Sequence, residues 1–209
     1  MYSVIFDMDG TLLDTQRICI PAWEYAGRRQ GIEGMGGYIY AVCGMNARGW
    51  GGYVLERHPE IDLEKFTVDS RAYALDNLKV EYKKGAGELL EHLWKLGART
   101  AVASGSSHQS IRHHLEELGV YERFDAIVGG YDVECGKPAP DIFLLAAEKI
   151  GARPSDCIVF EDSDNGVRAA HAAGMRVVGI PDIRPFSDDV RALLWHELTD
   201  MTEAIALFA

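Results

Sequence analysis

Five short runs of apolar, mostly β-branched residues recur along this chain without alternating with polar residues. They occupy positions 3–6, 100–103, 126–128, 157–160 and 176–180. An unbroken apolar run is typical of a strand that is buried on both faces, as in a parallel sheet. Patterns typical of amphipathic helices separate the later runs, so the order from residue 100 onward is repeatedly strand, helix, strand. This order predicts an α/β fold with a doubly wound parallel sheet.

The interval between the first and second runs is too long for a single connecting helix. It spans residues 7–99 and carries helical patterns over 15–31, 46–58 and 63–82. These helices need a core of their own, so we expect a small α-helical cap domain inserted after the first strand. The predicted boundaries are 1–15 and 82–209 for the core and 16–81 for the cap. In a protein with two such parts the active site often lies in the cleft between them.

The charge balance and the cysteines exclude several classes of protein. The 209 residues include 21 Lys and Arg against 32 Asp and Glu, a formal net charge of −11. This excess of acid argues against binding to nucleic acid or to an anionic membrane surface. No apolar run approaches the ~18 residues that span a bilayer, and we expect no secretory signal because the first residues lack a basic segment followed by an apolar one. The four cysteines show neither CxxC nor zinc-ligand spacing. We therefore expect a cytoplasmic protein with reduced thiols.

Polar residues follow three of the predicted strands, at the point where each strand ends. The pairs are Asp7 and Asp9 after the first strand, Ser104 and Gly105 after the second, and Glu161 and Asp162 after the fourth. The carboxyl ends of parallel strands lie along one edge of a sheet, and ligands bind at that edge. Three clusters that are remote in sequence are therefore expected to meet at one place.

The residue types in these clusters indicate phosphoryl transfer. Asp7, Asp9 and Asp162 would repel one another unless a cation lay between them, and carboxylate oxygens without His or Cys favour Mg²⁺. The glycine-containing turns offer N–H groups to an anion, and Lys137 adds a point charge suited to phosphate. Asp7 can attack phosphorus directly, and Asp9 can protonate the leaving oxygen and later deprotonate a water.

Each of these residues also has a purely structural interpretation. Asp7 and Asp9 could close a turn, and Ser104 could cap a helix. Lys137 could be a solvated loop residue. Glu161 and Asp162 could cap the helix that the sequence predicts from residue 165 onward.

Four motifs in this order resemble those of the haloacid dehalogenase superfamily. The segment 7–15, DMDGTLLDT, resembles its first motif, DxDGT. Ser104 after a strand resembles the second, and Lys137 within GKPAPD (136–141) resembles the third. The segment 161–163, EDS, with the Ala-rich helix that ends at residue 174, resembles the fourth. The motifs extend over essentially the whole chain and are closest to the subfamily whose helical cap follows the first motif.

The resemblance implies a fold and a set of roles. It implies a Rossmann-like core, Asp7 as the nucleophile, Asp9 as the acid and base, and Mg²⁺ held by Asp7, the Asp9 carbonyl and Asp162. It assigns Glu161 to support of the metal, and it assigns Ser104, Gly105 and Lys137 to the phosphate that is transferred.

Two cap residues are further candidates for contact with substrate. Arg48 follows a Gly-Met-Asn-Ala segment that resembles the substrate loop of related caps, and a solvated helix arginine is the equal alternative. Trp23 could offer a platform for a sugar, although a tryptophan at this position is more often part of a helical core.

The expected activity is Mg²⁺-dependent hydrolysis of a small phosphorylated metabolite, such as a sugar phosphate, by a monomer. The alternative is a phosphosugar mutase that resembles β-phosphoglucomutase. Alignment to that family through Ala22 and Trp23 places Cys19 where the mutase has a cap histidine, and a thiol is a poor hydrogen-bond substitute. A non-catalytic phosphate-binding module is a third possibility, and it would be expected to lack Asp7, Asp9 or Lys137.

Overall fold

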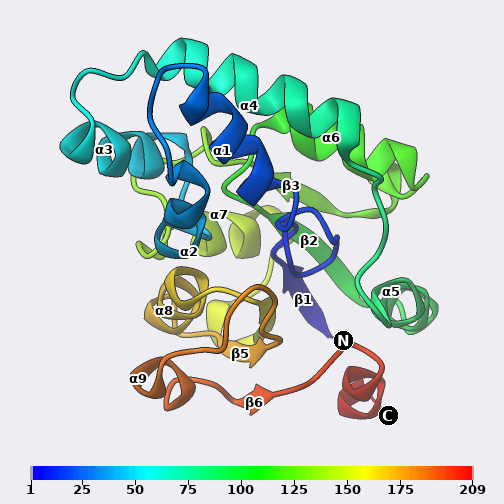
Figure 1. Ribbon diagram of the computed structural model, residues 1–209. Helices are drawn as coiled ribbons and strands as arrows, with labels where there is room; N and C mark the ends of the chain where they lie inside the picture. The colour runs from blue at the N-terminus through cyan, green and yellow to red at the C-terminus, as the bar shows by residue number, and fades with distance from the viewer. Residues whose placement is uncertain (1, 209) are drawn as a thin grey trace.

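The computed structural model describes residues 2–208, and a six-stranded parallel sheet forms its centre (Figure 1). The strand order is β3-β2-β1-β4-β5-β6, so the chain winds outward from β1 in both directions. The strands are β1 (Ser3–Phe6), β2 (Arg99–Ala103), β3 (Ala126–Val128), β4 (Cys157–Glu161), β5 (Arg176–Gly179) and β6 (His196–Glu197). The doubly wound α/β fold is therefore confirmed. The edge strand β6 was not predicted, because two polar residues form no apolar run.

The alternation of side chains along the strands divides the core into two layers. Val4 and Phe6 point to one face of the sheet, where they pack with α5 (Ala86–Lys95) and α6 (His108–Glu117). Ile5 points to the other face, where it packs with α7 (Asp141–Lys149), α8 (Asp164–Ala172) and α9 (Asp188–Arg191). Because both faces are covered, the strands need apolar residues at every position.

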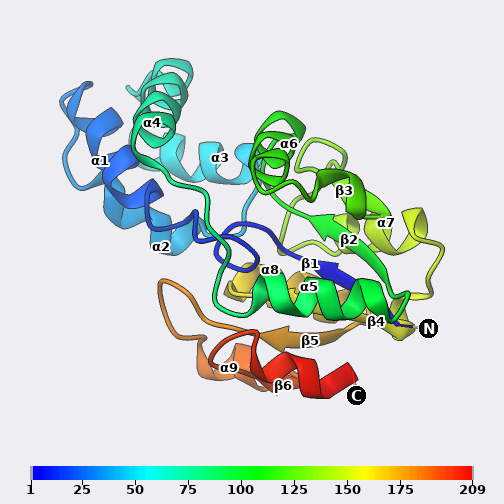
Figure 2. The same ribbon diagram turned by 90° about the vertical axis from the view of Figure 1, so that its right-hand side faces the viewer.

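Residues between β1 and β2 form a helical insertion with a hydrophobic cluster of its own. Its helices are α1 (Cys19–Arg28), α2 (Ile39–Val42), α3 (Ala47–Arg57) and α4 (Leu63–Asn77). The ring of Trp23 lies 5.1 Å from that of Phe66 and 5.2 Å from that of Trp50 at the centre of this cluster. Figure 2 shows the insertion beside the end of the sheet toward which the strands point.

Two segments link the insertion to the sheet. In both of them, fewer residues are helical than the sequence predicts. The helical pattern begins at residue 15 but α1 begins at Cys19, and α4 ends at Asn77 although the pattern continues to residue 82. The two linkers pair with each other near the sheet, because Asp14 N–H donates to the Glu81 carbonyl at 3.0 Å and Lys83 N–H donates to the Leu12 carbonyl at 2.8 Å. Side-by-side linkers thus connect the two parts.

None of the helices from residue 2 to 208 has the length and apolarity needed to cross a bilayer.

Substitution of Phe160 tests the packing that holds the centre of the sheet. Its ring is fully buried and stacks on Phe6 with 5.1 Å between centroids. Phe160→Ala is expected to lower the free energy of unfolding by about 3–5 kcal/mol, measured by urea denaturation with circular dichroism. Val68→Ala is the control, because Val68 is 62% exposed on α4, and its effect should stay within about 0.5 kcal/mol. Equal urea midpoints for the two variants would contradict this packing.

Candidate active site

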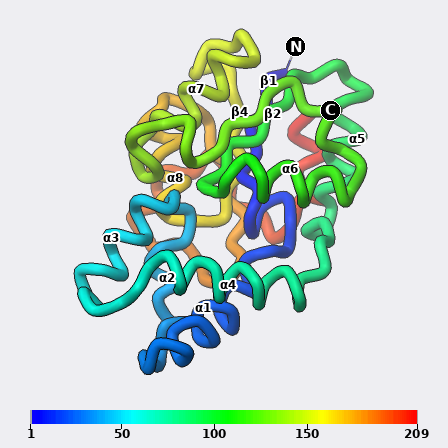
Figure 3. Tube along the Cα trace, turned by 90° about the horizontal axis from the view of Figure 1, so that it is seen from above, coloured from blue at the N-terminus to red at the C-terminus, as the bar shows by residue number. Residues whose placement is uncertain are grey.

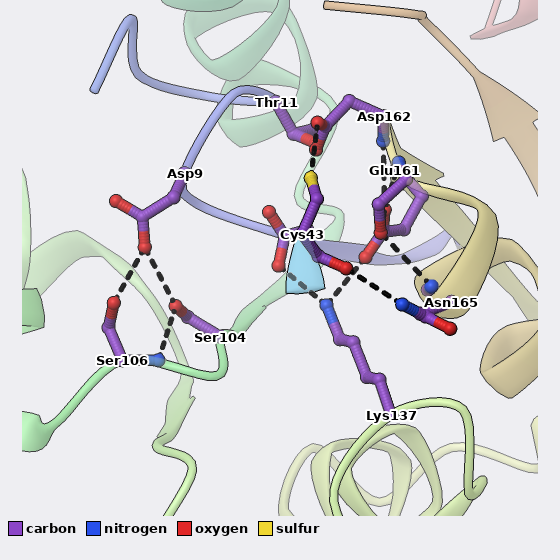
Figure 4. Close-up of polar contacts among 12 residues, drawn as sticks. Asp9, Thr11, Cys43, Ser104, Ser106, Lys137, Glu161, Asp162 and Asn165 are labelled. Atoms are coloured by element: carbon purple, nitrogen blue, oxygen red, sulfur yellow. Dashed lines mark hydrogen bonds and ion pairs between the residues drawn. The ribbon is translucent and has the colours of Figure 1, made fainter. Parts of the chain in front are cut away.

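The carboxyl ends of β1, β2 and β4 bring the expected polar residues to one place (Figure 4). Asp7 N–H donates to the Phe160 carbonyl at 3.0 Å, so Asp7 continues the pairing between β1 and β4. Ser104 N–H likewise donates to the Val128 carbonyl at 3.1 Å and continues the pairing between β2 and β3. Sheet hydrogen bonds therefore fix the backbone from which these side chains project.

Lys137 lies between two buried carboxylates. Its Nζ is 2.5 Å from Asp7 Oδ1 and 2.5 Å from Glu161 Oε1. Burial lowers the pKa of Lys137, but the charges of Asp7 and Glu161 outweigh burial and raise it above its ordinary value. Lys137 is therefore a permanent cation that joins the ends of β1 and β4.

Both carboxylate oxygens of Glu161 have partners, since Oε1 contacts Lys137 and Oε2 accepts several hydrogen bonds. Its Oε2 accepts hydrogen bonds from Asp162 N–H at 2.8 Å, from Ser163 N–H at 2.8 Å and from Ser163 Oγ at 2.9 Å. Ser163 also caps α8, because its Oγ accepts from Gly166 N–H at 3.0 Å. A Cβ added at Gly166 would lie 1.7 Å from Glu161 Oε1, so only glycine leaves room for this carboxylate. The start of α8 and the Glu161 side chain thus fix each other.

The side-chain nitrogen of Gln16 donates hydrogen bonds to both Asp162 and the Asp9 carbonyl. Gln16 Nε2 donates to the Asp9 carbonyl oxygen at 2.6 Å and to Asp162 Oδ2 at 3.0 Å. Thr11 Oγ1 donates to the other Asp162 oxygen at 2.8 Å. The two oxygens that Gln16 joins are two of the three that the sequence motifs assign to a metal.

Negative charge is in excess at the site. Burial, together with the charges of Glu161 and Asp9, raises the pKa of Asp7 to about 8 although Lys137 opposes the rise. Burial and the charges of Glu161 and Asp7 also raise the pKa of Asp162. A divalent cation would relieve this repulsion, because it favours the ionised form of both carboxylates.

These donors fit Mg²⁺. Carboxylate and carbonyl oxygens are its preferred protein ligands, and it usually keeps several waters, so few protein oxygens suffice. Within residues 2–208 no three His, Cys, Asp or Glu side chains form a metal cluster. The implied set does not require one, because it combines the carboxylates of Asp7 and Asp162 with the backbone carbonyl of Asp9.

The carboxylate of Asp9 is oriented by hydroxyl groups. Its Oδ1 accepts from Thr15 Oγ1 at 2.6 Å, and its Oδ2 accepts from Ser106 Oγ at 2.7 Å and from Ser104 Oγ at 3.2 Å. The Ser104 hydroxyl, which we expected to face the phosphate, thus contacts Asp9 in this structure. A Cβ at Gly105 would lie 2.8 Å from the Met45 carbonyl, so this glycine lets the insertion approach the core.

A cavity of about 770 Å³ lies between the helical insertion and the core, with Asp7 and Asp9 in its wall. Trp23 lines it while also packing in the cluster of the insertion. Arg48 on α3 and Arg71 on α4 are both exposed, but only Arg71 is among the residues that line the cavity. The insertion therefore presents a different arginine to the cavity from the one that the sequence singled out.

Four side chains that build the site were not among the candidate site residues, namely Thr15, Gln16, Asn46 and Ser106. Asn46 is buried, caps α3 by accepting from Gly49 N–H at 3.0 Å and donates to the Gly130 carbonyl at 3.2 Å. Its position before a helical pattern indicates a cap, but nothing in the sequence reveals its contact with the core. Ser106 stands two residues after Ser104 and could have been included on that ground.

Comparisons with known proteins agree with this geometry. A family model described as haloacid dehalogenase-like hydrolase matches residues 3–174. A fructose-1-phosphate phosphatase of Escherichia coli is 35% identical over 190 residues, covering 85% of this chain and 95% of that protein. A phosphorylated carbohydrates phosphatase of Thermotoga maritima is 31% identical and covers 86% of this chain and 85% of its own. The crystal structure of a hydrolase from Pseudomonas syringae, 27% identical, superimposes with a TM-score of 0.84 over 100% of this chain and 98% of the other.

Substitution of Gly166 tests the support of Glu161. Gly166→Ala is expected to displace that carboxylate and to lower the free energy of unfolding by about 1–3 kcal/mol, measured by urea denaturation. Gly52→Ala is the matched control, because a Cβ at Gly52 on α3 meets nothing within 4 Å. That helical change should stabilise the protein by about 0.5–1 kcal/mol. Identical stability changes for the two variants would show that Glu161 is not tightly packed against α8.

Proposed function

The chain belongs to the haloacid dehalogenase-like hydrolases, and we propose on that basis that it is a phosphatase of small phosphorylated metabolites. The observation that carries the proposal is the pair of Asp7 and Asp9 in the wall of one cavity, with Lys137 2.5 Å from Asp7. A nucleophile, an acid and a cation for phosphate thus lie together.

The proposed reaction proceeds through an aspartyl-phosphate on Asp7. A carboxylate oxygen of Asp7 attacks phosphorus, and the bond from phosphorus to the ester oxygen breaks. Asp9 gives its proton to that leaving oxygen, and the alcohol departs. Asp9 then takes a proton from a water, whose oxygen attacks the phosphoryl group and releases inorganic phosphate and free Asp7.

The neighbours of the two aspartates suit these roles. Lys137 neutralises one oxygen of Asp7 and offers its charge to the phosphoryl group. The hydroxyls of Thr15 and Ser106 hold the Asp9 carboxylate in one orientation, so that its proton transfers have a fixed geometry. The turn that contains Gly105 is proposed to donate backbone N–H groups to the phosphoryl oxygens, although the Ser106 N–H donates to Ser104 Oγ at 3.1 Å in this structure.

The proposed metal site uses the carboxylates of Asp7 and Asp162 and the carbonyl of Asp9, with Glu161 as support behind Asp162. Mg²⁺ held by these residues would supply positive charge beside the phosphoryl oxygens. Glu161 contributes indirectly, because it fixes the Asp162 backbone through the hydrogen bond from its N–H.

The helical insertion, residues 16–81, is proposed to act as a cap that excludes water from the cavity until substrate binds. The names of two similar phosphatases include a sugar phosphate and phosphorylated carbohydrates, which supports a small phosphorylated metabolite such as a sugar phosphate as substrate. The net charge of −11 and the four free thiols support action in the cytoplasm on a small molecule.

Removal of the nucleophile tests the proposed function. With p-nitrophenyl phosphate and magnesium, Asp7→Asn is expected to release phosphate at least about 10³-fold more slowly than the unchanged protein, because no covalent intermediate can form. EDTA should abolish the activity of the unchanged protein, and added magnesium should restore it. Equal rates for both proteins, with and without EDTA, would contradict the proposal.

A mutase would use the same aspartates but keep water away from the aspartyl-phosphate. Cys19 lines the cavity, but its thiol contacts the Thr15 carbonyl at 3.7 Å. We therefore expect phosphate release from β-glucose 1-phosphate to exceed its conversion to glucose 6-phosphate, even with a bisphosphate activator. Coupled assays of both products on the same sample measure the ratio. Conversion that is faster than phosphate release would favour the mutase.

A further inference from the structure

One wall of the cavity is a single face of α4. The lining residues from this helix and the segment after it are Thr67, Arg71, Ala74, Leu75 and Leu78. Apart from the adjacent pair Ala74 and Leu75, they are three or four residues apart, which places them along one side of the helix. This side is mostly apolar, so Arg71 is the charged group that α4 contributes to the cavity. Figure 3 shows α4 and α6 on opposite sides of a gap, and residues of both helices line the same cavity.

Arg71 differs from Arg112, the other arginine that lines the cavity, because no described residue is paired with it as a counter-ion. Asp69, two residues earlier on α4, is paired with Arg29 at 2.9 Å. Arg112 on α6 also lines the cavity, but it is paired with Glu116 at 2.7 Å. Among residues 2–208 no carboxylate forms an ion pair with Arg71, and no side chain or carbonyl accepts a hydrogen bond from it.

The wall opposite Arg71 offers polar groups that are also available. Gln109, His113 and His114 of α6 line the cavity. The Nδ1 atom of His114 is buried and has no hydrogen-bond partner among the described residues. Burial lowers the pKa of His114, so its ring is neutral at pH 7. The one carboxylate that α6 contributes to the lining, Glu116, is already paired with Arg112 at 2.7 Å, so this wall offers no unpaired anion to Arg71.

The catalytic end of the cavity cannot supply that anion either. The carboxylates there are held by Lys137, by hydroxyls and by Gln16, and the proposed reaction uses them. A guanidinium presents paired N–H donors that match the two oxygens of a carboxylate or phosphate. Arg71 is exposed and Leu75 beside it is 57% exposed, so the guanidinium is open to an incoming anion.

We propose that Arg71 binds a second anionic group of the substrate, a carboxylate or a phosphate, at the end remote from the phosphoryl group that is transferred. This inference rests on the proposed phosphatase function. The inference narrows the substrate class from any small phosphate ester to an ester that carries a second acidic group. Arg71 would be the residue that distinguishes such a substrate from a phosphorylated alcohol without a second charge.

Two pairs of substrates that differ in one acidic group test this proposal. The first pair is 3-phosphoglycerate against glycerol 3-phosphate, which reports a carboxylate. The second pair is fructose 1,6-bisphosphate against fructose 1-phosphate, which reports a phosphate. The unchanged protein is expected to prefer the doubly acidic member of at least one pair by about 10–100-fold in kcat/KM, because a charge-assisted contact is gained.

Arg71→Gln is expected to abolish that preference mainly by raising KM for the doubly acidic substrate, while kcat/KM for its neutral partner stays within about twofold. Arg71→Lys should keep part of the preference, because the charge remains but the paired geometry is lost. Lys65→Gln is the matched control. It removes the same charge from the same helix at an exposed position outside the lining, and it should leave the preference unchanged.

Hydrolysis of p-nitrophenyl phosphate separates the two ways in which the test can fail. If the unchanged protein hydrolyses it but shows no preference in either pair, or if Arg71→Gln keeps the preference, the assignment of Arg71 is overturned and the phosphatase function stands. An equal loss in Lys65→Gln would also overturn the assignment, because a general charge effect would explain it. If p-nitrophenyl phosphate is not hydrolysed, the proposed function fails and the inference fails with it.

Discussion

The ion pairs of Lys137 with Asp7 and Glu161 are the constraint on which the rest of the site depends. Two strands that are adjacent in the sheet but remote in sequence end in carboxylates that would repel each other if one cation did not join them. All three side chains are buried. Removing one partner from such a set leaves an uncompensated charge inside the protein, which is strongly destabilising. The loop that carries Lys137, the end of β1 and the end of β4 must therefore fold together.

The helical insertion contributes to the geometry of the core site as well as covering it. Gln16, in the linker, contacts both the Asp9 carbonyl and Asp162. Asn165 at the start of α8 donates to the Cys43 carbonyl at 3.0 Å, and Asn46 reaches the Gly130 carbonyl. Movement of the insertion would therefore break hydrogen bonds beside the proposed metal ligands.

The sequence was sufficient to predict the features that the strands determine, which are the parallel sheet and the group of polar residues at its edge. Five of the six strands follow from apolar runs, and the residues after β1, β2 and β4 had to meet because parallel strands end at one edge. What depends on docking of the helical insertion could not be predicted in this way. The spacing of α4 indicates a helix, but only the packing shows that Arg71, and not Arg48, faces the cavity. Likewise, Gln16 lies within a helical pattern, but it precedes α1 in the structure and its side chain contacts the site.

The most direct test of the account is to locate the phosphoryl group during turnover. Asp9→Asn with p-nitrophenyl phosphate should trap it, because this leaving group departs without a proton while the later attack by water lacks its base. Acid quenching followed by peptide mass spectrometry is predicted to find one phosphoryl group on the peptide that contains Asp7. A phosphoryl group on another residue, or turnover in which the peptide of Asp7 is never modified, would contradict the account.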